Sequence, residues 1–247
     1  MTGATPEANG THETYTVTDA YARLVLETMP QESKIGLTVG FERTFGVPEI
    51  ARVLHGTGRM TSEPRARAKA TGGAMFALVG RGVDSAEGRR IVDGLRAVHD
   101  RPDITPELMR YVLACFTVCP LRFIDRHGHR QVTDEERDGA YAFHLGLALA
   151  LRLPEPEDGQ LADVERWMDD FERDRFAPSD EGAALWRAAG EGLLAKRLPA
   201  ALVPLARSLA AALLDSPLSA ALGVRRPPAP ARAVVTYGLR VRSRRGR

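Results

Sequence analysis

The chain has 247 residues, of which 34 are basic and 32 acidic, giving a formal net charge of +2. This balance lacks the basic footprint of a nucleic-acid-binding protein, and all but three of the basic residues are arginines. No apolar stretch reaches the roughly 18 residues of a membrane span, and the N-terminus has no basic-then-apolar signal pattern. We therefore expect a cytoplasmic protein with no nucleic-acid partner and no transmembrane segment.

Composition divides the chain into three parts. Residues 1–16 are polar and predict a flexible N-terminal lead. Residues 17–222 predict one large helical domain, and residues 223–247 form a Pro- and Arg-rich tail without a core of its own. The only strand-like alternation lies at 233–237, inside that tail.

The first half of the domain carries clear helix signals. Pro48 suits the first turn of a helix that runs through Leu54 and ends at Gly56 or Gly58. A second helix should span 64–79. A third should begin after a cap at Asp84 or Ser85 and carry an apolar stripe, whose members are Ile91, Val92, Leu95, Val98 and His99.

The second half continues in the same way. Residues 107–124 are apolar around most of a helical circumference, which predicts a central buried helix that Pro120 kinks or ends. Thr133 and Glu136 form a capping box for a helix reaching about Leu151. Further amphipathic helices are expected in three places: from 161 to 171, 181–197 and 200–214. The fold class predicted is all-α.

The stretch RARAKATGG, residues 65–73, combines charge and glycine at the start of an apolar segment. On a helix, Arg67, Thr71 and Met75 share one stripe, and Lys69 points to nearly the opposite side. Two mid-helix glycines, Gly72 and Gly73, together cost about 2 kcal/mol relative to alanine. A solvated basic first turn is one interpretation, and a flat ligand or closely crossing helix is the other.

Three histidines raise the question of metal binding. His99 lies on an apolar face, where a core histidine with one hydrogen bond and an iron or heme ligand are both consistent with the pattern. His127 and His129 follow Cys115 and Cys119, but this spacing matches no strong zinc pattern. We expect a polar surface loop at the two histidines and reduced core thiols at the two cysteines.

Taken in order, the motifs resemble the oxygenase family that includes the MpaB-like enzymes and, more distantly, the latex clearing proteins. The resemblance covers roughly residues 37–190. It rests on FERTFGVPEIARVLHGTG, on Arg67-x-x-x-Thr71, on GLRAVH ending in His99, and on the long segment from ITPELMRYVLACF to HGHRQVTDEER. It implies an all-α fold with a globin-like core.

The resemblance also implies a cofactor and a site. His99, 28 residues after Thr71, corresponds to the proximal ligand of a b-type heme in latex clearing proteins. Arg67 and Thr71 would then be catalytic pocket residues, and Arg122 and Arg130 would be further candidates for pairing with heme propionates. The implied function is a heme-dependent oxygenase that uses dioxygen or a peroxide on a lipophilic, olefinic natural product. Apolar side chains would line its pocket, among them Met75, Phe76, Met109 and Phe116.

The chain departs from this family in two respects. Latex clearing proteins place a lysine directly before the motif threonine, where this chain has Ala70, and Lys69 is the nearest lysine. Their catalytic glutamate has no obvious counterpart, and Glu49 and Glu63 are the carboxylates available upstream. Two alternatives remain open: a non-catalytic helical protein that binds heme or a lipophilic ligand, and a helical interaction module that uses the Arg-rich tail.

Overall fold

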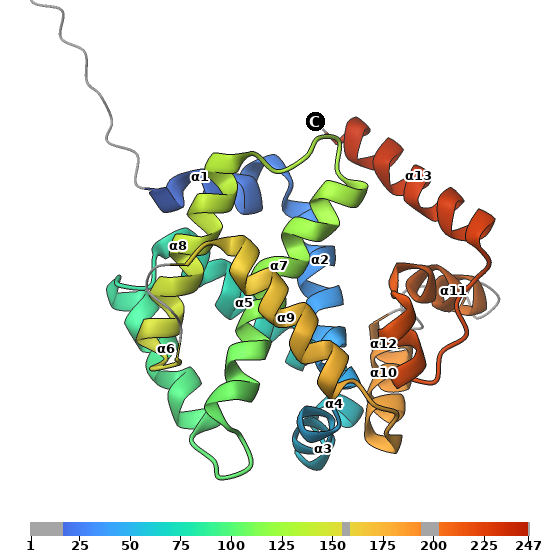
Figure 1. The fold of residues 1–247 in the computed structure, drawn as a ribbon, viewed down its shortest axis with the longest axis horizontal. Helices are drawn as coiled ribbons and strands as arrows, with labels where there is room; N and C mark the ends of the chain where they lie inside the picture. Colours follow the sequence, from blue (N-terminus) through green and yellow to red (C-terminus); the bar gives the residue numbers. More distant parts are fainter. Residues whose placement is uncertain (1–16, 155–158, 194–202, 247) are drawn as a thin grey trace, which may run out of the picture.

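The computed structural model describes residues 17–154, 159–193 and 203–246, and within these residues every regular element is a helix (Figure 1). The predicted all-α class is thereby confirmed. The N-terminal lead predicted for 1–16 lies outside the described residues. So do residues 194–197 and 200–202 of two predicted helices.

The first elements are α1 (Val17–Arg23), a π-helical turn (Leu24–Thr28), α2 (Pro30–Arg43), a 3-10 turn (Thr44–Gly46), α3 (Pro48–Gly56), α4 (Arg59–Ser62), α5 (Pro64–Arg81) and α6 (Ala86–His99). The later elements are α7 (Pro106–His127), α8 (Asp134–Ala150), α9 (Leu161–Arg175), α10 (Asp180–Leu193), α11 (Val203–Leu213), α12 (Ser216–Ala221) and α13 (Ala229–Arg245).

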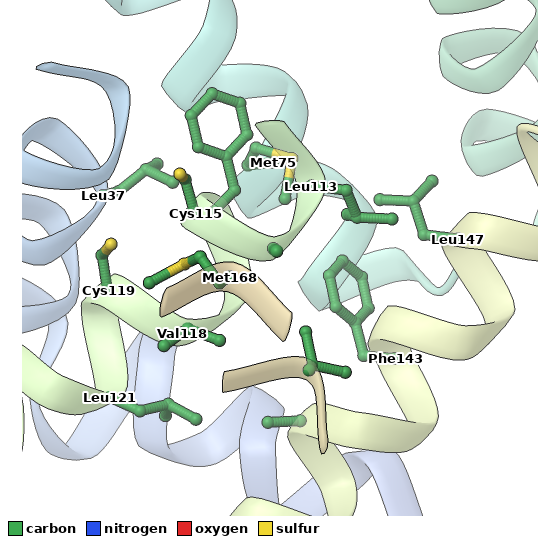
Figure 2. Packing of buried hydrophobic residues seen from close by; sticks show 14 of the residues in the cluster. Leu37, Met75, Leu113, Cys115, Val118, Cys119, Leu121, Phe143, Leu147 and Met168 are labelled. Atoms are coloured by element: carbon green, nitrogen blue, oxygen red, sulfur yellow. The ribbon is translucent and has the colours of Figure 1, made fainter. Parts of the chain in front are cut away.

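Helix α7 is the centre of the fold, and α2, α8 and α9 pack around it (Figure 1). Its buried face meets side chains from the surrounding helices, as Figure 2 shows for Leu37 of α2, Met75 of α5 and Phe143 of α8. Cys115 and Cys119 are both buried free thiols in this core, as expected. A smaller second cluster joins α3, α4, α10 and α12.

Helix starts follow their sequence signals. Ser85 caps α6 by accepting a hydrogen bond from the Gly88 amide at 2.9 Å. Thr133 and Glu136 form the predicted capping box of α8. Proline occupies the first turn of α3 and α5, where its missing N–H has no intrahelical partner to lose.

The structure decides against helix termination at Pro120, one of the two outcomes expected there, and against a strand at 233–237. Pro120 does not end α7, which continues to His127, because burial around the whole helix outweighs the one hydrogen bond that proline cannot make. Residues 233–237 are helical within α13, not a strand. The tail packs on α7, and Arg240 Nε donates to the Arg126 carbonyl oxygen at 2.9 Å, so tertiary contacts override the local β-branched composition.

Two glycines let α2 approach α7 closely. A Cβ added to Gly36 would lie 2.5 Å from Pro120 Cα, and one added to Gly40 would lie 2.5 Å from the Cys115 carbonyl oxygen. Both obstacles are backbone atoms and cannot rotate away. By contrast, a Cβ at Gly72 in α5 would have only Leu37 Cδ2 nearby, at 3.9 Å.

These distances predict opposite effects for the same substitution. Gly40→Ala should lower the free energy of unfolding by about 1–3 kcal/mol because the clash forces α2 away from α7. Gly72→Ala should raise it by roughly 0.5–1 kcal/mol in ligand-free protein, because alanine is the better helix former and meets no obstacle. Urea denaturation of the two variants measures both, and equal changes would contradict the close approach.

Candidate active site

A large cavity of about 1410 Å³ lies between α2, α5, α10 and α11. The helix α2 presents a face of regular spacing to it, made of Gln31, Lys34, Ile35, Thr38, Val39 and Glu42. The opposite wall is α5, which contributes Arg65, Ala68, Lys69, Thr71, Gly72, Gly73 and Phe76. Trp186 of α10 and one side of α11 complete much of the described lining; the α11 residues are Arg207, Ser208, Ala210, Ala211 and Leu213.

One face of α5 lines the cavity and another packs in the core, whereas the sequence predicted a single ligand-facing stripe with Arg67, Thr71 and Met75. Gly72 and Gly73 open onto the cavity together with Lys69, which had been expected to face away from any ligand. Arg67 is not part of the lining, and Met75 is buried in the core around α7. Thr71 lies on the stripe that carries Arg67 and also borders the cavity.

His99 has the hydrogen bonding of a neutral ligand histidine. Its Nδ1 lies 2.7 Å from the carbonyl oxygen of Leu95, one turn earlier in α6. A carbonyl only accepts, so this contact places the proton on Nδ1 and leaves the Nε2 lone pair available. The pKa of His99 is lowered, first by burial and then, against the effect of the Leu95 bond, by the positive charge of Arg67. The imidazole is therefore held neutral.

Arg67 lies close enough to His99 to affect its ionisation, so the structure brings these two predicted residues together. The guanidinium is half-buried and makes no ion pair within the described part of the chain. Burial and the nearby charge of Arg59 lower the pKa of Arg67. The Arg67 charge beside a neutral imidazole, with Arg59 near Arg67, makes a place where an anionic group would be stabilised.

Thr71 carries a buried hydroxyl without a partner. No hydrogen bond to its Oγ1 is present among the residues that the structure describes. A threonine hydroxyl in a helix can donate a hydrogen bond to the backbone carbonyl oxygen four residues earlier. Thr71 does not make this bond. An unsatisfied buried hydroxyl costs free energy, which a bound polar ligand atom would recover.

Glu42 is the acidic residue of the described cavity lining, and sequence reasoning missed it. Burial raises the pKa of its carboxyl group to about 8. At neutral pH the side chain is largely protonated and can donate a hydrogen bond into the cavity. The sequence signal that could have placed Glu42 at the cavity is its spacing of four residues from Thr38 and eight from Lys34, which puts the three side chains on one face of α2.

This raised pKa gives a pH dependence whose sign is fixed. In the folded state the Glu42 carboxyl group keeps its proton up to about pH 8, whereas in the unfolded state it releases the proton near the ordinary pKa of 4.5. The stability that comes from the protonated carboxyl group is therefore complete below pH 4.5 and is lost as pH rises to about 8. Glu42→Gln should therefore gain stability relative to the parent protein between pH 5 and pH 9. Urea unfolding at these two pH values measures it, and a parallel pH profile for both proteins would contradict the buried carboxyl group.

The two further candidates for propionate pairing have acidic partners of their own. Arg122 binds Asp169 through two hydrogen bonds of 2.7 and 2.9 Å, and a third reaches Glu165. Arg130 binds both carboxylate oxygens of Glu136, at 2.8 and 2.6 Å. Neither arginine lines the cavity, so the structure does not bring them together with Thr71.

The other sequence candidates also have defined places. Glu49 pairs with Arg175 at 3.1 Å, and Glu63 is exposed at the start of α5. Phe76 lines the cavity, Phe116 is buried in the core, and Met109 is half-buried outside the described lining. No group of three or more histidine, cysteine or acidic side chains suited to a metal ion is found in the described ranges.

An all-α protein with a large lined cavity and a neutral, oriented histidine has the features of a helical ligand- or cofactor-binding domain. The described helices include none with the length and apolar character needed to cross a membrane. The family model for the catalytic domain of ER-bound oxygenases of the mpaB/B′ type and rubber oxygenases matches residues 44–244. The chain therefore belongs to this oxygenase family. No curated protein matches it.

Proposed function

We propose that this protein is a heme b-dependent oxygenase in which His99 is the proximal iron ligand. The observation that carries the proposal is the pairing of His99, neutral and with Nε2 free to ligate, with the uncompensated charge of Arg67. Membership of an oxygenase family supports the reaction class. His99 would be sufficient as the protein ligand to the iron, because the porphyrin brings four nitrogen ligands of its own.

The residues present fit such a group in three ways. His99 has the hydrogen bond to a carbonyl that orients ligand histidines and increases their basicity. Arg67, with Arg59 beside it, would pair with a propionate. The unsatisfied Thr71 hydroxyl would donate to a polar atom of the cofactor or of bound substrate.

Heme supplies the activation of dioxygen or a peroxide when it is bound. The chain supplies the rest. The apolar part of the cavity, including Leu37, Phe41 and Phe76, excludes water and accepts a lipophilic, olefinic substrate. Glu42 holds a proton on its carboxyl group near neutral pH and would donate a hydrogen bond to a polar atom of a ligand in the cavity.

Hemin titration of the purified protein tests the proposal. One equivalent should produce a saturated Soret band, and a protein that stays colourless would contradict heme dependence. Oxygen uptake by the reduced, loaded protein with squalene as a probe alkene then separates two functions. Uptake above that of free heme supports the oxygenase. Stoichiometric heme binding without uptake favours the carrier or sensor that the sequence also allowed.

A further inference from the structure

The cavity lining has a one-sided charge. Its described residues include six basic side chains, Lys34, Arg65, Lys69, Arg187, Arg207 and Arg225, against the single acidic Glu42. The whole chain carries nearly equal numbers of basic and acidic residues. A chain rich in arginine explains why many lining side chains are basic, but it does not explain why only one described lining side chain is acidic. The excess of positive charge is therefore a feature of the cavity and not of the whole chain.

The basic and apolar residues occupy different depths. Lys34, Lys69 and Arg225 are exposed. Met60 and Ala189, at 1% and 2% exposure, lie among the buried apolar part of the lining. The cavity therefore has a basic mouth and an apolar interior, which is the pattern that accommodates an amphiphile.

Several of these cations lack an acidic counterpart. Within the described ranges, Lys34, Lys69 and Arg225 form no ion pair, and Arg187 donates only to the Ala183 carbonyl oxygen, at 3.3 Å. Glu42 offsets little of their charge because burial raises its pKa to about 8 and keeps it mostly protonated. Charge at the mouth is thus available for an anionic ligand.

We propose that the cavity binds an anionic amphiphile, with its apolar body between α2 and α5 and its carboxylate or phosphate group at the basic mouth near Lys34 and Lys69. This inference rests on the proposed function, because it names the substrate class of that oxygenase. Heme propionates do not account for these cations, since neither His99 nor Arg67 beside it is among the described residues that line the cavity.

Matched ligands of one chain length test the charge requirement. Dodecanoate, dodecyl phosphate and dodecanol are titrated into the hemin-loaded and hemin-free protein, with emission of the cavity residue Trp186 as the readout and Trp186→Phe as the signal control. Both anions should bind at least about tenfold more tightly than the alcohol, a difference of ~1.4 kcal/mol. The preference should shrink as salt rises. The anion that binds more tightly identifies the preferred head group, carboxylate or phosphate.

A double variant locates the preference. Lys34→Gln with Lys69→Gln should weaken dodecanoate binding about tenfold and change dodecanol binding less than twofold. The control pair Arg52→Gln with Arg90→Gln removes two exposed charges outside the cavity lining and should change neither. Equal affinity for acid and alcohol, or equal loss of both in the cavity variant, would overturn the proposal.

Two further outcomes would also overturn it. If dodecanoate lowers the Soret band by displacing hemin, the cations serve the cofactor. If the double variant loses binding to phosphatidylglycerol vesicles while its dodecanoate preference persists, they serve a membrane surface. The two proposals fail separately: anion preference in a protein that never binds hemin removes the heme function alone, and hemin binding without anion preference removes the substrate class alone.

Discussion

Replacing Glu172 by alanine should lower the free energy of unfolding by about 3–5 kcal/mol, the range for breaking a buried ion pair. Glu172 accepts a hydrogen bond from Arg43 Nε at 2.7 Å, a second one from the same guanidinium, and one from the Tyr111 hydroxyl at 2.9 Å. The side chains of Arg43 and Glu172 are only 11% and 6% exposed. Without the carboxylate, Arg43 keeps Asp215 alone, at 2.6 Å.

An exposed pair provides the control. Asp170 and Arg173 on the outer side of α9 are 64% and 69% exposed, so Asp170→Ala should cost no more than about 1 kcal/mol. Urea denaturation at pH 7 compares the two variants. A Glu172→Ala cost near that of the exposed pair would show that the buried network contributes little stability.

This network also matters for the cavity. Arg43 directly follows Glu42 at the end of α2, and its bonds to Glu172 of α9 and Asp215 before α12 fix that end of the helix. The position of the Glu42 carboxyl group therefore depends on contacts with residues more than 120 positions later in the chain. Such long-range contacts are not encoded in local spacing.

Most helices could be predicted from short stretches of sequence, because a helix start depends on residues within its own first turn. Pro48, Pro64, Ser85 and Thr133 mark helix starts through the backbone amides that they lack or satisfy, and these four predictions are confirmed. The helix α2 was not assigned from the sequence. Its α7 side carries Gly36 and Gly40 and its cavity side mixes charged and apolar groups, so it shows no apolar stripe.

The candidate site was also inferred from local spacing, and its assignment stays a prediction. The nearness of Arg67 and His99 agrees with their assignment to one site. The place of Lys69 was wrong because helical spacing fixes relative direction only, and the wall that α10 and α11 form opposite that face depends on distant packing. The globin-like core, heme, its ligand and the substrate remain predictions.

His99→Gly should weaken hemin binding at least about 100-fold. Removing a group that only hydrogen-bonds to a metal ligand already lowers metal affinity by about 10–100-fold, and removing the ligand itself should lower it at least as much. His99 is the residue proposed to bond the iron itself. The control is His55→Gly, which removes an exposed histidine near the end of α3. This control should bind hemin like the parent protein.

The absorption spectrum of His99→Gly with and without added imidazole tests the central claim most directly. Free imidazole should enter the space left by the side chain, bind the iron and restore the Soret band of the parent protein. A His99→Gly protein that shows the parental spectrum without imidazole would contradict His99 ligation and with it the proposed heme site.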